Sequence, residues 1–331
     1  MEKRLSIFGI SLDKLPQWVV LVIGVCGVFL SFVTQGTAQE YLWQKTSFRQ
    51  AIFLTLVQFM GYFLLSSRFF WRWLAGKERS HAPLWYYAIT STALVASMMF
   101  SNLSVTRLSY PTAVLFKSSK LIPVMIGGRL FLGKHYSFLE VLSVLLMVLG
   151  LFGISVSDKI SKNTFDFVGV FISLLSLAFD AVSSNLQEKA LWEYKATQSE
   201  VISMQYFIGI LILLTTTICT GEFQDGFAIA STNWDVTAAL LAFTFLGGIG
   251  VQFVYLLINA FGSLVAVMVT STRKATTVTL SFILFPNKRF TIYHFLSICA
   301  VASGISLNYY AKNLKKKQME SERVPLLANR H

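Results

Sequence analysis

The chain has 331 residues, of which 54% are hydrophobic and only 13% are charged, about half the charged share of an ordinary soluble domain. Its mean hydropathy of +0.61 leaves too little polar surface for a soluble globule of this size, which excludes a disordered chain and argues against a soluble two-domain enzyme. The net charge of +12 suits a nucleic-acid-binding protein only if the basic residues share a solvated surface.

Apolar segments follow one another along almost the whole chain. The length of each segment falls within the roughly 17–25 residues that a helix needs to cross about 30 Å of hydrocarbon. The segments are 18–40, 51–70, 84–104, 111–131, 137–156, 167–189, 199–219, 236–258, 262–285 and 291–311. The longest connections, near 71–83 and 220–235, are too short to bury a soluble core. We therefore predict an all-α polytopic membrane protein with ten transmembrane helices in a single domain, 1–331.

The basic residues outside these segments indicate an orientation. An even number of spans places both termini on one side, and the terminal-side segments carry 17 Lys and Arg against seven in the opposite loops. Cytosolic loops are enriched in Lys and Arg, so both termini are predicted to be cytosolic, with 312–331 as a basic cytosolic tail. Most of the positive charge thus reflects topology, and we expect no nucleic-acid partner.

Two halves of the chain show weak internal similarity. Shifting the sequence by 154 positions aligns 109–150 with 263–304, with nine identical positions out of 42, and places Lys120 on Lys274 and Lys134 on Lys288. Gln39-Glu40 at the end of the first span is echoed by Gln187-Glu188 at the end of the sixth. Five spans are an odd number, so the halves, about 18–156 and 167–311, must be inverted repeats, which typically form a site at their interface near the midplane.

Four basic residues lie in the middle of predicted spans. They are Lys117 and Lys120 in the fourth span and Arg273 and Lys274 in the ninth. A charged side chain there costs at least roughly 2.5–3.5 kcal/mol, so it is expected to have a function. Lys117 and Lys120 are three residues apart and share one helix face. The pattern predicts a cationic pocket for a multiply charged anion, in which Arg273 forms a forked phosphate contact.

Small hydroxyl residues accompany both pairs, notably Ser118 and Thr270. They allow helices to approach closely and offer hydrogen bonds, so we include them in the predicted site. Aromatic residues such as Tyr110, Tyr206 and Tyr255 are candidates for stacking on a nucleotide base, although helix packing is the better explanation for any one of them.

Acidic residues supply the competing interpretation, a purely structural charge network. Glu40, Asp180 and Glu188 are the candidate counter-charges, but three acids do not cancel four bases. Glu40 and Glu188 lie near span ends, where they either face the membrane interface or act as a gate or internal counter-ion when substrate is absent.

Motifs for catalysis, metals and cofactors are missing from the sequence. It contains no H-E-x-x-H, G-x-S-x-G, P-loop or dinucleotide fingerprint, and its histidines lie in loops, near a span end or at the terminus. Cys26, Cys219 and Cys299 are odd in number and far apart, which fits neither disulfides nor a zinc site. We expect no metal, no cofactor and no enzymatic activity.

Several strings give the chain a family resemblance. The run Tyr110–Met125, the string Thr272-Arg273-Lys274-Ala275, and the segments Asp180–Val182 and Asn185–Lys189 resemble the nucleotide-sugar transporter family of the drug/metabolite transporter superfamily, and within it the carriers of 3′-phosphoadenosine 5′-phosphosulfate (PAPS). The resemblance implies a ten-helix inverted-repeat antiporter of the Golgi or endoplasmic reticulum membrane, with Lys117, Lys120, Arg273 and Lys274 holding the phosphates.

The expected activity is exchange of cytosolic PAPS for a nucleotide monophosphate or 3′,5′-ADP across the Golgi membrane. Exchange of UDP-galactose/UDP-glucose or of ATP/ADP in either compartment remains open, because such relatives have similar strings. The rival classes are a non-transporting scaffold and an integral-membrane transferase. A homodimer is not excluded, and Glu322–Leu327 has the spacing of an acidic dileucine signal for a sorting adaptor.

Overall fold

The computed structural model describes residues 6–7, 10–45, 48, 50–107, 119–157, 167–284 and 292–328. Apart from a two-residue antiparallel ladder, β1 (Ser6–Ile7) with β2 (Ile10–Ser11), its regular structure is helical. The helices are α1 (Gln17–Lys45), α2 (Ala51–Leu74), α3 (Leu84–Arg107), α5 (Leu121–Leu132), α6 (Phe138–Ser157), α7 (Phe167–Trp192), α8 (Gln198–Thr220), α9 (Glu222–Thr232), α10 (Trp234–Phe261), α11 (Ser263–Leu284) and α12 (Ile292–Ala328). The prediction of a helical membrane protein is confirmed.

Five of the described helices are long and apolar enough to cross a bilayer: α1 through Gln39, α2, α7, α8 and α10. Leu121–Leu132 and Phe138–Gly153 are shorter apolar helices. Two helical features were not predicted. Residues 222–232 form α9 inside a segment that we expected to be a connection, and α12 continues without a break into the basic tail.

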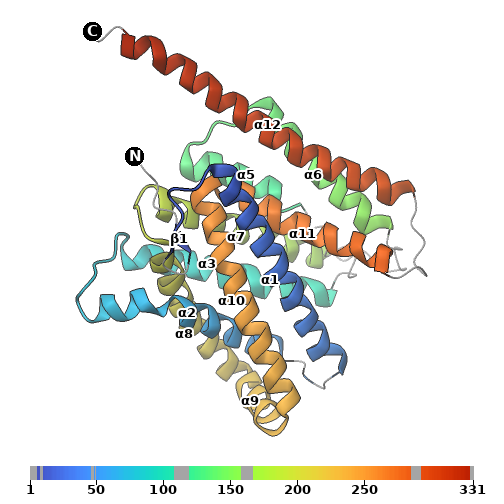
Figure 1. The fold of residues 1–331 in the computed structure, drawn as a ribbon. Helices are drawn as coiled ribbons and strands as arrows, with labels where there is room; N and C mark the ends of the chain where they lie inside the picture. Colours follow the sequence, from blue (N-terminus) through green and yellow to red (C-terminus); the bar gives the residue numbers. More distant parts are fainter. Residues whose placement is uncertain are drawn as a thin grey trace.

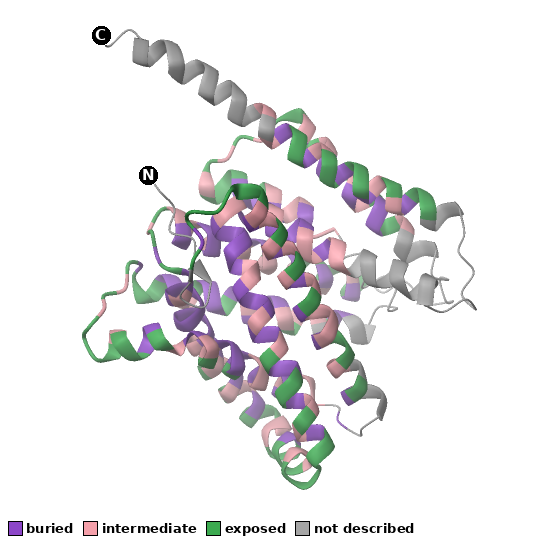
Figure 2. Cartoon of the chain, viewed as in Figure 1, coloured by how far each residue is buried: buried purple, intermediate pink, exposed green. Residues whose placement is uncertain are grey.

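Helices distant in the sequence pair along their lengths. α1 packs against α10, α2 against α8, α3 against α7, and α6 against α12 (Figure 1). Buried residues concentrate where helices face one another, whereas the outer faces are exposed (Figure 2). Because those outer faces carry large apolar side chains such as Leu30, Phe245 and Phe295, their natural surroundings are lipid tails.

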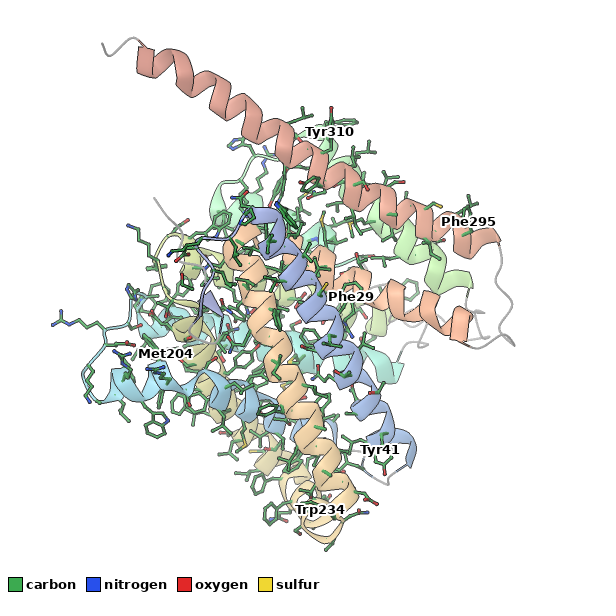
Figure 3. All side chains as sticks on the ribbon, in the orientation of Figure 1. Phe29, Tyr41, Met204, Trp234, Phe295 and Tyr310 are labelled. Atoms are coloured by element: carbon green, nitrogen blue, oxygen red, sulfur yellow. The ribbon has the colours of Figure 1, made fainter. Side chains whose placement is uncertain are left out.

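The helix bundle has two ends, which carry different connections. The α7–α8 end contains the connections 75–83, 133–137 and 193–197 and the junction at Gly262, and the α9 end contains α9 and the start of α2. Exposed aromatic side chains mark both ends. Trp18 and Trp85, in the first turns of α1 and α3, lie near the α7–α8 end. Tyr41 and Trp234 lie near the α9 end (Figure 3). Tyr and Trp are typical of membrane–water interfaces, so the two ends correspond to the two interfaces.

Glycines with positive φ punctuate the chain at both ends. Gly221, with φ of 78°, separates α8 from α9, and Gly262, with φ of 92°, separates α10 from α11. L-residues with side chains rarely adopt this region, so these positions favour glycine. Between these two glycines, α10 begins with an N-cap: the amide of Asp235 donates to the Asn233 side chain (3.1 Å).

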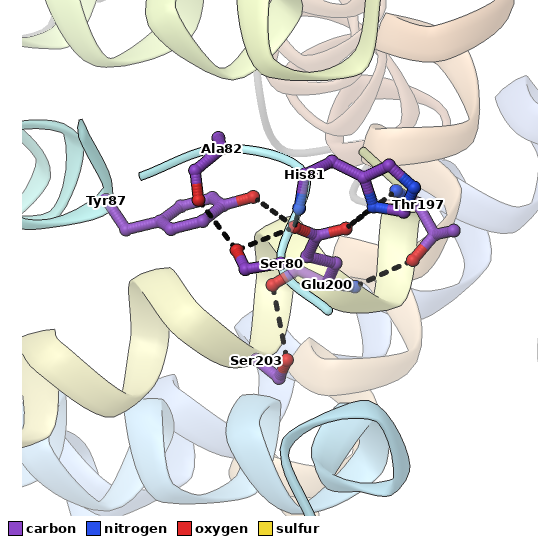
Figure 4. A network of polar contacts seen from close by, with 7 residues as sticks. All are labelled: Ser80, His81, Ala82, Tyr87, Thr197, Glu200 and Ser203. Carbon is purple, nitrogen blue, oxygen red and sulfur yellow. Dashed lines mark hydrogen bonds and ion pairs between the residues drawn. The ribbon is translucent and has the colours of Figure 1, made fainter. Parts of the chain in front are cut away.

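A buried carboxylate organises part of the α7–α8 end (Figure 4). Glu200, in the first turn of α8, is 0% exposed and accepts hydrogen bonds from the His81 amide (2.7 Å), the Ser80 hydroxyl (3.0 Å) and the Tyr87 hydroxyl (2.9 Å). It also forms a capping box with Thr197. One side chain therefore fixes the α2–α3 connection and α3 to the start of α8.

Candidate functional site

A cavity with two lobes lies inside the bundle. The larger lobe, about 420 Å³, is lined by residues of α1, α2, α3 and α7 and reaches Ala51, the first residue of α2. The smaller lobe, about 260 Å³, reaches Ser263, the first residue of α11. The larger lobe therefore extends toward the α9 end and the smaller toward the α7–α8 end. Four residues line both lobes and mark their junction: Phe32, Lys120, Asp180 and Arg273.

Lys120 is positioned by the start of α5, where it is the N-cap residue. Pro123 lies in the first turn, where backbone amides have no acceptor within the helix, so the missing N–H costs little there. The Lys120 Nζ lies 3.8 Å from Asp180 Oδ2, and their side chains are 22% and 27% exposed. The pair is thus long and accessible from the cavity.

Arg273 enters the junction from α11. Its Nη1 donates to the Phe32 carbonyl (3.1 Å), and its guanidinium carbon lies 5.3 Å from the centre of the Phe32 ring. These contacts hold Arg273 against α1 and leave its planar fork beside the cavity. Thr270, one turn earlier, lines the smaller lobe and donates its hydroxyl to the Val267 carbonyl (3.1 Å).

Two of the four predicted basic residues, Lys120 and Arg273, therefore lie together with Asp180 and Thr270. Tyr110, Lys117 and Ser118 lie outside the described residues. Lys274 and Glu40 belong to α11 and α1, but their side chains lie outside the described part of the chain.

The smaller lobe combines aromatic and amide side chains. Tyr206 and Tyr255, both named from the sequence as candidates for base stacking, line it. The Tyr255 hydroxyl donates to Gln205 Oε1 (2.6 Å), and the Gln187 amide donates to the same oxygen (3.2 Å). This network fixes the polar groups beside the two rings, both of which are buried.

The larger lobe is lined by amides and hydroxyls that the sequence analysis did not include in the site. Gln35, Gln39 and Gln58 line it, together with Ser97 and Ser176. The signal that could have identified them is a carboxamide or hydroxyl in the middle of an apolar span. That signal is weak because such groups also bond within the helix bundle, as Ser176 does to the Ser97 carbonyl (2.8 Å).

Glu188 occupies a different place from the junction. It is 0% exposed and pairs with Lys134, which follows α5, at the α7–α8 end of the smaller lobe. Asp180 is the acidic partner of Lys120. In the described part of the chain, His, Cys, Asp and Glu side chains form no group of three that would hold a metal ion.

Comparisons with known proteins identify a family and several relatives of this chain. Residues 20–312 match the model of the UAA transporter family. The chain is 36% identical to the mouse adenosine 3′-phospho 5′-phosphosulfate transporter 2 over 317 residues, covering 95% of this chain and 85% of that protein. It is also 36% identical to the human protein of that name (95% and 78% covered) and 35% identical to the Drosophila melanogaster one (94% and 82%).

The fold also has a solved counterpart. One crystal structure superposes with a TM-score of 0.66 at 12% identity, covering 90% of this chain and 99% of its own. The relatives are transporters, which confirms the prediction of a transporter rather than an enzyme. Because the family model spans most of the chain and the relatives are 36% identical over 95% of it, this multi-pass membrane protein belongs to the UAA transporter family.

Proposed function

We propose that this chain carries PAPS from the cytosol into the lumen of the Golgi by alternating access, in exchange for a nucleotide monophosphate or 3′,5′-ADP. The relatives' names support PAPS as the substrate. The observation that carries the proposal is that Lys120 of α5 and Arg273 of α11 line the same two-lobed cavity.

The chemistry of the junction suits a nucleotide with several anionic groups. Arg273 presents a planar fork for a phosphate, and Lys120 supplies a point charge that substrate takes over from Asp180. Basic groups in a bilayer are expensive unless they are neutralised, so the carrier whose bases are neutralised by the bound anion reorients more readily than the empty carrier. This accounts for exchange rather than one-way leakage.

The remaining sequence-based site residues complete the proposal. Lys117 and Lys274 add charge for the second phosphate or the sulfate, and Ser118 and Thr270 add hydroxyl donors. Tyr110 is proposed to stack on the base. Positions in the sequence support these assignments. Lys117 and Ser118 lie within three residues of Lys120, and Thr270 and Lys274 lie within three residues of Arg273. Tyr110 directly precedes the segment 111–131, which contains Lys120.

Architecture and orientation form part of the proposal. We assign ten transmembrane helices as two inverted repeats, 18–156 and 167–311, followed by the cytosolic tail 312–331. The excess of Lys and Arg on the terminal side supports cytosolic termini, and α1 begins on the side of the bundle toward which α12 ends (Figure 1). The α7–α8 end is then cytosolic. Glu322–Leu327 would be exposed there to a sorting adaptor, and retention in the endoplasmic reticulum is the alternative.

Ligand-induced stabilisation of the purified protein tests the substrate. A ligand that binds only the folded state raises the Tm in proportion to the logarithm of its concentration over Kd. We expect PAPS and 3′,5′-ADP to raise the Tm of the intact protein, and Asp180→Asn to keep the response. Stabilisation by UDP-glucose, UDP-galactose or ATP alone would reassign the substrate within the family.

A further inference from the structure

Glu188 connects three segments at the α7–α8 end. From α7, its Oε2 accepts hydrogen bonds from the Ser263 amide (3.0 Å) and the Ser263 hydroxyl (2.7 Å) at the first residue of α11. Its Oε1 pairs with the Nζ of Lys134, in the connection that follows α5. We call Glu188, Lys134 and Ser263 the latch, because one carboxylate holds the ends of α5, α7 and α11 together.

The latch lies at the α7–α8 end of the smaller lobe, which it borders through Ser263. Ser263 lines that lobe, and so does Gln187, the residue preceding Glu188. Glu188 is fully buried, whereas the Lys134 side chain is 22% exposed and its Nζ lies 4.7 Å from the centre of the Trp192 ring. A ligand that approaches from the α7–α8 end therefore meets the ammonium group of the latch before its carboxylate.

The glycine at position 262 leaves room for the side chains of the latch. At Gly262, with φ of 92°, a Cβ atom would lie 2.7 Å from Glu188 Oε1 and 3.2 Å from Lys134 Nζ. The Lys312 Nζ also donates to the Phe261 carbonyl (3.0 Å), which ties α12 to the same junction. Because α11 begins here and carries Arg273 further along, the latch contacts the helix that supplies a basic group to the cavity.

A second buried group lies close to the carboxylate. Tyr136, in the connection between α5 and α6, has its pKa raised by burial and further by the nearby Glu188 and Glu140 carboxylates. It therefore remains a neutral phenol at cytosolic pH. The ammonium of Lys134 is the basic partner that the structure shows for Glu188, and a neutral Tyr136 adds no negative charge beside that pair.

We propose that the latch is an anion-exchange gate: a phosphate or sulfate group arriving at the α7–α8 end takes Lys134 from Glu188 and so opens that end of the smaller lobe. This inference rests on the proposed nucleotide transport. The arriving group offers Lys134 an anion of equal or greater charge, while Glu188 keeps its two hydrogen bonds from Ser263. Lys134 is thus a transient nucleotide-binding residue outside the central junction.

Cysteine accessibility tests the gate without any nucleotide. In a full-length background with Cys26, Cys219 and Cys299 replaced by Ser, Ser184→Cys places one thiol in the smaller lobe. A membrane-impermeant methanethiosulfonate reagent is then applied from the α7–α8 side of sealed, oriented vesicles. We expect Glu188→Gln and Lys134→Gln each to raise the modification rate about tenfold. This corresponds to an increase of about tenfold in the fraction of molecules whose smaller lobe is open at the α7–α8 end.

Glu140→Gln is the matched control. Glu140 is a carboxylate of similar burial near the same end, but it accepts the Ser137 amide (2.8 Å) at the start of α6 rather than the Ser263 donors that begin α11. We expect it to leave the modification rate unchanged. If Glu188→Gln does not yield monodisperse protein, Ser263→Ala, which removes one of the two donors, should raise the rate in the same direction. Rates equal to the control in all latch variants would overturn the gate.

Sided transport kinetics test the exchange step. For PAPS supplied at the α7–α8 side, we expect Lys134→Gln to raise KM while KM for uptake from the α9 side is unchanged. Equal KM changes on both sides, or none, would contradict a role for Lys134 in anion exchange. The two experiments separate the gate from the substrate. If the protein transports no nucleotide, but Glu188→Gln still raises the modification rate of the Ser184→Cys thiol, the proposed substrate is refuted and the gate is retained.

Discussion

Apolar side chains pack at both ends of the bundle, but the two ends differ in their buried carboxylates. At the α7–α8 end, the fully buried carboxylates of Glu188 and Glu200 bridge several segments. At the α9 end, Phe53, Leu42 and Phe243 belong to an apolar cluster, and the carboxylate of Glu222 accepts the Ile52 amide (2.8 Å) at the start of α2. An ion pair can be exchanged for another anion, whereas apolar packing cannot. The comparison places the exchangeable contacts at the end that the larger lobe does not reach.

The largest expected effect comes from the junction between these ends. Lys120→Ala should reduce PAPS uptake to background, because it removes the charge shared by both lobes and leaves Asp180 without its partner. Lys274→Ala, from the sequence, should do the same. The control is Lys189→Ala, whose side chain pairs with Glu193 on the surface. Uptake in reconstituted vesicles of monodisperse protein is the measurement, and full activity in Lys120→Ala would make that residue structural.

A substitution at the α10–α11 junction should destabilise the α7–α8 end most. Gly262→Ala places a Cβ against the latch in a backbone conformation that is essentially restricted to glycine, at a cost of about 1–3 kcal/mol. Gly36→Ala is the control, since nothing lies within 4 Å of its added Cβ. Thermal unfolding in detergent should show a lower Tm for Gly262→Ala only. Equal Tm values would mean that the latch tolerates the methyl group.

The Glu200 network should also contribute measurably to stability. Glu200→Gln replaces one acceptor oxygen by a donor amide facing the Ser80, His81 and Tyr87 donors, so buried groups lose their partners at about 1–3 kcal/mol. We expect a lower Tm with PAPS-dependent stabilisation retained, because Glu200 does not line either lobe. Loss of ligand response without loss of stability would argue against a purely structural role.

The smallest effect is expected at the α9 end. Glu222→Gln keeps one acceptor oxygen for the Ile52 and Phe53 amides and loses only the charge at the start of α2, about 0.3–1 kcal/mol. Its Tm should therefore fall less than that of Glu200→Gln, measured under identical conditions. A larger fall would show that this carboxylate, rather than the apolar cluster around Phe53, holds the α9 end.

Much of this arrangement follows from the sequence, and the reason is the cost of charge in a bilayer. Uninterrupted apolar segments indicated the helices, and the rarity of mid-span bases indicated Lys120 and Arg273. The helix α9 was missed because residues 222–232 are too polar to resemble a span. The glutamine-lined lobe was missed because amides such as Gln58 are chemically unremarkable until their spatial neighbours are known.

The partners of the acidic residues were harder to predict from the sequence, because they too depend on which residues are neighbours in space. Sequence reasoning named Asp180 and Glu188 as counter-charges but did not distinguish between the available lysines. The fold separates them: Asp180 pairs with Lys120 in the cavity, and Glu188 pairs with Lys134 at the end of the bundle. Such pairings depend on which helices pack together, and that information is non-local.

Counterflow in reconstituted liposomes tests the central claim most directly. Purified full-length protein is reconstituted into liposomes that are empty or preloaded with 3′,5′-ADP, AMP or UMP, and uptake of radiolabelled PAPS is followed. We predict that preloading with 3′,5′-ADP or AMP accelerates uptake and that Lys120→Ala abolishes this acceleration. PAPS uptake that is the same in empty and preloaded liposomes, or that is absent in all of them, would contradict the account.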